Sequence, residues 1–406
     1  MPVFNSLGSN YTLFSALRIL CAFPSQRKRR KLITYLADRY DGAAFLTYKG
    51  RDALSLALTS IGLTNTSVAF NGLTCYVVYE AIVNAAYQPC FLDISEDSLN
   101  FSPEILAAAF EKYPIRVVVV QNTLGYPCDI RAIKALCVQR RALLIEDIAH
   151  CVGTRYPSGE EAGTVGDFAV LSFGQDKSLD GVAGGALIVR NPDYRNRIAQ
   201  PKEHVGRYRQ AKDRLYLLMT VVTRTTYSLG IGIVLRALYS AYARRYRRHA
   251  AGPALSKKAP LMYDMPNSYC ANILKRFRTL ERDISRRREV AHIYADGFAK
   301  EILLEKDATY VDRAMNLRFP IVVTDRDRLV EYLATKSVHV RDIWYTAPLA
   351  PKEMLRFSSY RGECPVAQNV ADRIVNLPTH GGITPRIAHS IVKMVKDWRA
   401  KEHWNR

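Results

Sequence analysis

The sequence is short of acidic residues. Its 406 residues include 58 Lys and Arg against 38 Asp and Glu, a formal net charge of +20. It also lacks internal repeats, low-complexity tracts and paired cysteine spacings, since its eight cysteines are scattered. These absences argue against a repeat protein, a disulfide framework and a metal site, and we expect reduced thiols. The chain is 48% hydrophobic and 24% charged, which is typical of a globular protein, and its length is sufficient for two or three domains.

Long uninterrupted apolar runs are scarce as well. Residues 13–23 are apolar, but the run is short and Arg18 interrupts it. Because it has neither a basic start nor a small-residue cleavage site, we do not expect a secretory signal. The expected location is therefore the cytoplasm.

A longer apolar run occupies residues 215–243, where Arg224 and Arg236 interrupt it. It is almost long enough to span a bilayer, but the arginines favour an amphipathic helical pair instead. Two placements remain open. The pair could lie on the inner face of the membrane, with the arginines of 213–248 reaching anionic head groups, or pack against the body of the protein or a partner subunit.

Basic residues are concentrated in three places. Every residue of 27–31 is Lys or Arg, and residues 286–288 are all Arg. Residues 202–250 contain eleven Lys and Arg against two acidic residues, Glu203 and Asp213. Such clusters attract polyanions: nucleic acid, anionic lipid or diphosphate substrates. The alternative is that they are solvated faces of helices.

Strand and helix patterns alternate between residues 53 and 190. The segment 117–121 begins with four consecutive valines, a pattern that is typical of a strand buried on both faces of a parallel sheet. Strands separated by single helices predict an α/β fold with a mostly parallel central sheet. The expected strands are 67–71, 90–94, 117–121, 142–146, 168–172 and 186–190, and the expected helices are 53–61, 77–86, 103–112 and 130–140.

We divide the chain into four parts. They are an N-terminal basic, helical segment (1–44), a large domain (45–206), an apolar and basic helical insertion (207–260) and a smaller C-terminal α/β domain (261–406). In the last part the patterns predict helices over 272–298, 325–335 and 384–398, and strands over 317–323, 338–341 and 375–378.

Three polar side chains lie at or shortly after the ends of predicted strands: Asp147, Ser172 and Lys177. Ligands of parallel sheets gather at the carboxyl ends of the strands, so we expect these residues to lie close together. An acid, a hydroxyl and a lysine are the groups that a pyridoxal 5′-phosphate site requires. The lysine amine would form a Schiff base with the cofactor aldehyde, and the carboxylate would keep a proton on the pyridine nitrogen.

Seven short segments follow one another along the chain in a recognisable order. They are Gly-Arg-Asp-Ala-Leu at 50–54, Thr-Cys-Tyr at 74–76, Gly-Tyr-Pro-Cys-Asp at 125–129, Ile-Glu-Asp-Ile-Ala-His at 145–150, Ala-Gly-Thr-Val-Gly-Asp at 162–167, the lysine loop 172–185 and Asn-Leu-Pro-Thr-His at 376–380. Together they resemble the DegT/DnrJ/StrS family of pyridoxal-phosphate aminotransferases. The resemblance implies fold type I of the pyridoxal-phosphate enzymes, the fold of aspartate aminotransferase, and a homodimer.

The resemblance implies catalytic roles for three residues. Lys177 would hold the cofactor and then move the proton during amino transfer, as general base and acid. Asp147 would pair with the pyridinium nitrogen. His150 would lie near the phenolate oxygen of the cofactor or pack against its ring.

Five further residues are implied to bind the cofactor. Ser172 and the backbone amides of Gly50 and Arg51 would hold the phosphate at the start of a helix. Cys75 and Tyr76 stand where the family has the aromatic residue that stacks on the ring.

The chain departs from the family pattern in two segments. Val182-Ala183 replaces the usual Gly-Glu after the lysine, and 262–265 read Met-Tyr-Asp-Met where the family has Asn-Tyr-Arg-Met. In the family that asparagine reaches the cofactor phosphate of the neighbouring subunit, and this segment has neither the asparagine nor the arginine. Residues 338–348, where the family touches its substrate, contain aromatics and Arg341 that could serve an unusual acceptor.

The expected activity is ping-pong transamination in amino-sugar and polysaccharide biosynthesis. By resemblance, glutamate donates the amino group and a keto-sugar, expected to be nucleotide-linked, accepts it. Family members that dehydrate sugars have histidine in place of the lysine, so Lys177 favours transamination. Two alternatives stay open: a pyridoxal-phosphate enzyme of another reaction type acting on a lipid-linked acceptor at a membrane, and a non-catalytic regulator on the same fold. Nucleic acid is not the expected partner.

Overall fold

A seven-stranded sheet forms the centre of the computed structural model, which describes residues 2–95, 98–235, 237, 262–304 and 308–404. Only β9 runs antiparallel to its neighbours, so the sheet is mostly parallel, as the sequence predicts. Its strand order is β2 (Ala43–Thr47), β9 (Gly185–Val189), β8 (Phe168–Ser172), β7 (Leu143–Asp147), β6 (Ile115–Val120), β3 (Ser67–Asn71) and β5 (Gln88–Leu92).

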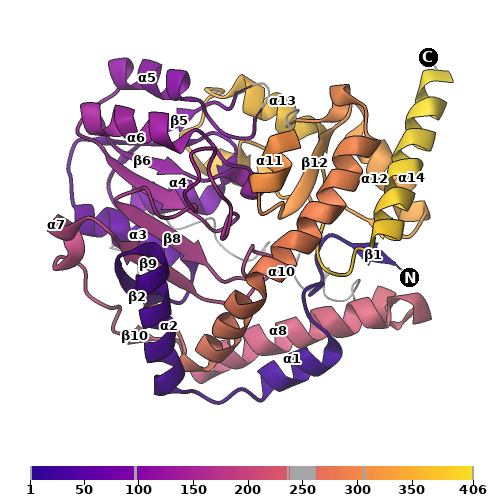
Figure 1. The fold of residues 1–406 in the computed structure, drawn as a ribbon, viewed down its shortest axis with the longest axis horizontal. Coiled ribbons are helices and arrows are strands. Elements are labelled where there is room, and N and C mark those ends of the chain that lie inside the picture. Colours follow the sequence, from indigo (N-terminus) through magenta and orange to yellow (C-terminus); the bar gives the residue numbers. More distant parts are fainter. Residues whose placement is uncertain (1, 96–97, 236, 238–261, 305–307, 405–406) are drawn as a thin grey trace.

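Helices cover both faces of this sheet (Figure 1). Val117, Val118, Val119 and Val120 of β6 are all buried, because alternate side chains enter the two cores. One core is formed with α3 (Gly50–Ile61) and α4 (Tyr76–Asn84), and the other with α2 (Gln26–Tyr40), α5 (Pro103–Lys112), α6 (Ile130–Gln139) and the first half of α10 (Asn267–Gly297).

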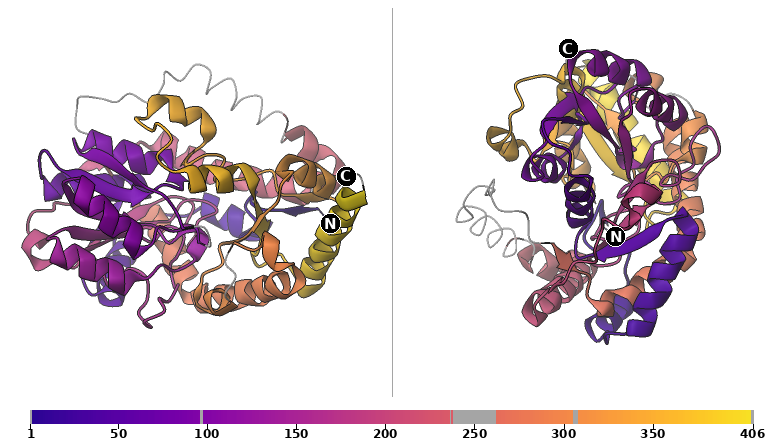
Figure 2. Two further views of the ribbon diagram at one scale, coloured as in Figure 1. Left: turned by 90° about the horizontal axis from the view of Figure 1, so that it is seen from above. Right: turned by 90° about the vertical axis from the view of Figure 1, so that its left-hand side faces the viewer.

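A smaller lobe contains the C-terminal part of the chain (Figure 2). Strands β12 (Arg318–Val322) and β15 (Ile374–Pro378) pair antiparallel, and the second half of α10 packs in the core beside them. The 31-residue α10 therefore belongs to the cores of both lobes. The other helices of this lobe are α11 (Ala308–Arg313), α12 (Arg326–Thr335), α13 (Pro365–Arg373) and α14 (Pro385–Trp404).

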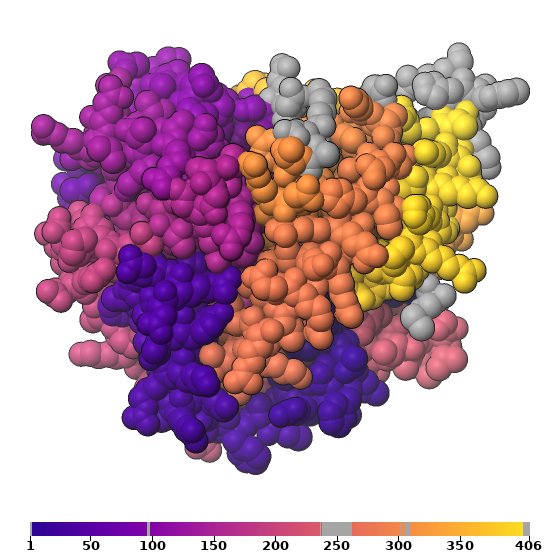
Figure 3. Space-filling model, in the orientation of Figure 1, coloured from indigo at the N-terminus to yellow at the C-terminus, as the bar shows by residue number. Residues whose placement is uncertain are grey.

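The N-terminus also belongs to the smaller lobe. The two-residue strand β1 (Val3–Phe4) pairs in parallel with β13 (Val338–His339). After β1 the chain turns into α1 (Leu13–Leu20), which packs on α8 (Arg207–Thr225). In Figure 3 the N-terminal residues form the lower edge of the molecule, next to the segment that contains α8.

Helix α8 is the first part of the segment 207–260. Its buried face, with Leu217 and Val221, packs against Ala16 and Ile19 of α1. No helix in the described part of the chain is long and apolar enough to cross a bilayer. The second helix expected in this segment falls largely on residues 238–260, which lie outside the described residues.

Candidate active site

The carboxyl edge of the sheet borders a cavity of about 280 Å³. Because β7 and β8 are adjacent and parallel, Asp147 and Ser172 end neighbouring strands at this edge. Lys177 reaches the same cavity from the loop between β8 and β9. The residues that line the cavity include Lys49, Gly50, Arg51, Cys75, Gln121, Asp147, His150, Ser172, Lys177 and Tyr345.

Lys177 and His150 are in direct contact, with 2.9 Å between Nζ and Nε2. The backbone N–H of Leu124 donates to Nδ1 of His150 at 3.4 Å, which assigns the acceptor role to Nδ1. Burial holds the pKa of His150 well below its ordinary value, and the positive charge of Arg318 adds to this effect, so the imidazole is neutral. Its proton is then on Nε2 and is donated to the lysine nitrogen.

This arrangement requires a lysine nitrogen with a lone pair. Burial lowers the pKa of Lys177. Cys75 and Asp147 oppose this effect, and the smaller effects of Arg318 and Arg51 add to it. The hydrogen bond from His150 and the burial of the amine therefore both favour the neutral form. The neutral amine is the nucleophilic form of lysine.

Asp147 is a buried acid, with 8% of its surface exposed. One carboxylate oxygen, Oδ1, accepts from the backbone N–H of Ala149 at 3.0 Å. Burial raises the pKa of this carboxyl, while the Ala149 amide and the charge of Lys177 oppose the rise. A buried acid with one protein donor has capacity for a further N–H donor, which a protonated pyridine nitrogen supplies.

The start of α3 is shaped to receive an anion. The N-cap residue Lys49 makes no side-chain capping bond, so first-turn amides of the helix are available. Gly50 is required here, since a Cβ at this position would lie 2.7 Å from Cβ of Ser172. The Ser172 hydroxyl and the Gly50 and Arg51 amides thus border one space without an intervening side chain. The Arg51 side chain is half-exposed and lies 3.9 Å from Glu80.

Three residues at the site were not predicted individually from the sequence. Trp344 stacks on His150, with 4.9 Å between ring centroids, and Nζ of Lys177 lies 4.9 Å from the Trp344 ring. The guanidinium of Arg318 lies 4.1 Å from the same ring. The Tyr345 hydroxyl is 3.1 Å from Nδ1 of His150. The only sequence signal was the aromatic content of residues 338–348.

Tyr76 is not among the residues that line the cavity. Cys75 lines the cavity, whereas Tyr76 is buried in the core beneath α4, in contact with the ring of Tyr79. Its hydroxyl donates to the carbonyl of Phe357 at 3.3 Å. The physical reason is that Tyr76 is the first residue of α4 and faces the inner side of that helix. The aromatic ring that Nζ of Lys177 faces is that of Trp344.

These groups fit pyridoxal 5′-phosphate. A lysine amine, a buried acid and a phosphate cradle open to one cavity at the carboxyl edge of a mostly parallel sheet. Fold and cavity together define a pyridoxal-phosphate enzyme of fold type I. The described residues contain no cluster of His, Cys, Asp and Glu that could hold a metal ion.

The chain belongs to the DegT/DnrJ/EryC1/StrS aminotransferase family, whose model matches residues 29–396. It is 22% identical over 358 residues to GDP-perosamine synthase of Vibrio cholerae, covering 86% of this chain and 84% of that protein. The structure of DesV from S. venezuelae superposes with a TM-score of 0.69 at 18% identity, covering 95% and 94% of the two chains. DesI, solved in the presence of its TDP-sugar product, also gives 0.69, at 19% identity and with 99% and 96% covered.

Proposed function

We propose that the protein transfers an amino group from glutamate to a nucleotide-linked keto-sugar. The placement of Lys177 and Asp147 at one cavity, in a chain of this aminotransferase family, carries the proposal. The relatives support the substrate class: one is a GDP-perosamine synthase, and DesI was solved in the presence of its TDP-sugar product. The donor rests on the family resemblance.

In this proposal each residue at the cavity has a distinct role. When bound, pyridoxal phosphate supplies an aldehyde that accepts the amino group and a ring that withdraws electrons from the reacting carbon. Ser172 and the amides of Gly50 and Arg51 hold its phosphate. Asp147 keeps a proton on the ring nitrogen by offering a buried negative charge. Lys177, as the neutral amine, would take the proton from the substrate carbon that is bonded to the transferred nitrogen and would return it to the carbon on the other side of that nitrogen.

His150 and Trp344 position these groups. His150 donates a hydrogen bond from Nε2 to the Lys177 nitrogen, and this bond orients the lone pair of the lysine nitrogen toward the imidazole. Trp344 holds the imidazole by stacking. We propose that Trp344 supplies the aromatic surface that Cys75 does not.

Lys177→Ala provides the test. The variant should lose the visible absorbance of the lysine-bound cofactor and at least about a thousandfold of the rate at which glutamate yields 2-oxoglutarate with a panel of keto-sugar nucleotides. Lys112→Ala, at the end of α5, is the matched control. If the visible band persists in Lys177→Ala, the assignment of the lysine is wrong. If the parent protein shows the band but no keto-sugar accepts the amino group, the substrate class is wrong.

We also propose a homodimer with peripheral membrane contact through the segment 213–248, of which 213–235 and 237 are described. Exposed apolar side chains on α1 and α8 support the contact, among them Phe14, Leu215 and Met219. The same observation favours a second candidate function: amino transfer, or another pyridoxal-phosphate reaction, on a lipid-linked acceptor. A keto-sugar carried by a lipid diphosphate in the substrate panel distinguishes the two.

A further inference from the structure

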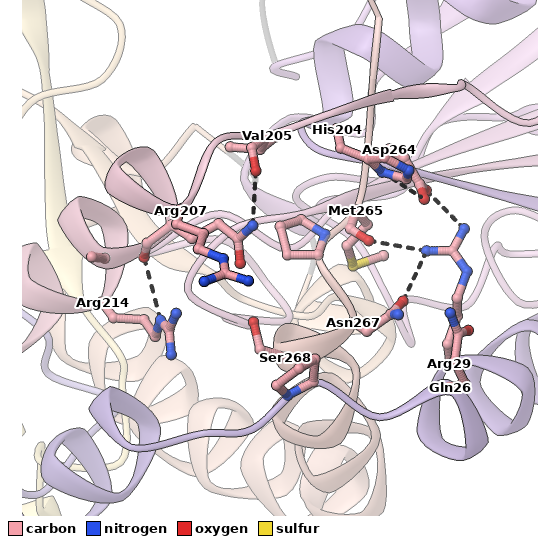
Figure 4. Close-up of a pocket in the computed structure, with 14 residues that line it drawn as sticks. Gln26, Arg29, His204, Val205, Arg207, Arg214, Asp264, Met265, Asn267 and Ser268 are labelled. Carbon is pink, nitrogen blue, oxygen red and sulfur yellow. Dashed lines mark hydrogen bonds and ion pairs between the residues drawn. The ribbon is translucent and has the colours of Figure 1, made fainter.

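A second cavity lies between the N-terminal ends of α8 and α10 (Figure 4). Its volume is about 650 Å³, and it shares no lining residue with the cavity at Lys177. This is the size of a typical small-molecule site. The mechanism proposed above uses none of the side chains that line it.

Two helices begin at this cavity without compensation of their dipoles. Helix α8 follows Gly206 and α10 follows Pro266, and neither N-cap makes a side-chain hydrogen bond. Neither first turn contains an acidic residue. The amides of the first helical turn carry partial positive charge and point out of the helix, so two uncapped helix starts favour an anion.

Ser268 is an independent indication of a ligand. It lies in the first turn of α10, is 4% exposed, and its Oγ has no hydrogen-bond partner among the described residues. In Figure 4 this hydroxyl points into the space beside the Arg207 guanidinium. A buried hydroxyl without a partner costs about 1–3 kcal/mol, which a ligand oxygen would recover.

The lining is also positively charged. It contains three arginines and one carboxylate, Asp264, which pairs with Arg29 at 2.7 Å. The guanidinium of Arg214 donates to carbonyl groups that follow α1, at 3.1 and 3.3 Å, and pairs with no carboxylate among the residues that the structure describes. Arg207 is exposed and makes no ion pair within the described part of the chain. Two positive charges therefore remain for a ligand.

We propose that this cavity binds a phosphate group. The Ser268 hydroxyl and the amides of Asn267 and Ser268 contact its oxygens, and Arg207 and Arg214 balance its charge. The group belongs either to a soluble phosphorylated molecule or to a phospholipid head group. The second source is relevant because Pro24 lines the cavity and the adjacent Phe23 is 85% exposed.

Titration calorimetry with pyrophosphate tests the site. The protein is first saturated with pyridoxal phosphate, so that the phosphate cradle at Gly50 is filled. Arg207→Ala should weaken binding about tenfold or more, and Ser268→Ala about fivefold. Lys28→Ala removes an equal charge from the nearby start of α2 without altering the lining, and should leave the affinity within about twofold. The visible cofactor absorbance confirms that each variant is folded.

A second arm separates the two sources. The same variants are sedimented with phosphatidylcholine vesicles, with and without phosphatidylglycerol. Pyrophosphate binding that depends on Arg207 and Ser268 indicates a soluble ligand. Weak pyrophosphate binding, combined with vesicle binding that depends on both residues, indicates a head group. The proposal is overturned if neither probe binds, if Lys28→Ala has the effect of Arg207→Ala, or if Arg51→Ala alone abolishes pyrophosphate binding.

Discussion

Within the described part of the chain the carboxylate of Asp147 accepts one hydrogen bond and is buried at the cavity, so its negative charge has a specific use in the proposed reaction. Asp147→Asn keeps the size of the side chain and removes the charge that would hold a proton on the ring nitrogen. We expect the rate of amino transfer to fall by about 10²–10⁴-fold, while the visible absorbance remains because Lys177 is intact. Asp147→Glu, which keeps the charge, should lose less. Equal rates for Asn and wild type would remove Asp147 from the mechanism.

Because of Asp176, which precedes Lys177, we expect the free energy of unfolding to depend on pH. Burial and the charge of Asp180 raise the pKa of Asp176 to about 7 in the folded protein. The folded state therefore binds the proton more tightly than the unfolded state. This contribution to stability is fully present below about pH 4 and is lost as the pH rises through 7.

Asp176→Asn should accordingly flatten the fall in unfolding free energy between pH 4 and 7, by on the order of 2 kcal/mol. Asn tolerates the left-handed backbone of this residue, whose φ is 64°. Chemical denaturation at a series of pH values measures the effect, with exposed Asp193→Asn as the control for loss of one carboxylate. An unchanged slope in Asp176→Asn would mean that the carboxyl titrates normally in the folded protein.

At the scale of elements, α5 is defined by its first residues. Ser102 is the N-cap, and its side chain accepts from the N–H of Ile105 at 3.4 Å, before Pro103 fixes the first turn. Ser102→Ala should destabilise the helix by about 1 kcal/mol, and Ser102→Asp should not. Hydrogen exchange of the α5 amides reports this local change, with about fivefold faster exchange expected for Ala only. Identical exchange in the two variants would contradict a capping role.

The same local signals explain why most elements were predictable. Pro103–Lys112 and Phe168–Ser172 agree residue for residue with the sequence prediction, because caps and continuous apolar runs act locally. The pairing of β1 with β13 was not predictable, since two residues carry no period and the partner is more than 300 residues away. Trp344 escaped for a related reason: it lies in irregular chain, and only the folded structure brings it to His150.

At the scale of the whole molecule, arginines of α8 lie close to an exposed apolar surface on α1 and α8. Arginines of α8 lie at the second cavity, and the outer face of the α1 and α8 pair exposes apolar side chains. Leu13, Phe14 and Leu17 are spaced as neighbours on one face of α1, and Leu215 and Met219 on one face of α8. An apolar face with adjacent arginines is the combination that binds an anionic membrane surface.

Phe14, which is 76% exposed, and Met219, which is 41% exposed, provide a test of this membrane contact. Replacing both by Ser should reduce binding to vesicles containing phosphatidylglycerol by at least about tenfold, because each apolar side chain gains roughly 1.5–3 kcal/mol on leaving water. Val138→Ser on α6, where valine is 65% exposed, is the matched control and should bind as the parent does. Raising the salt concentration should weaken binding of the parent, since the arginine contribution is screened. If the double variant binds vesicles normally but sediments as a smaller species than the parent, this face is the subunit interface and not a membrane contact.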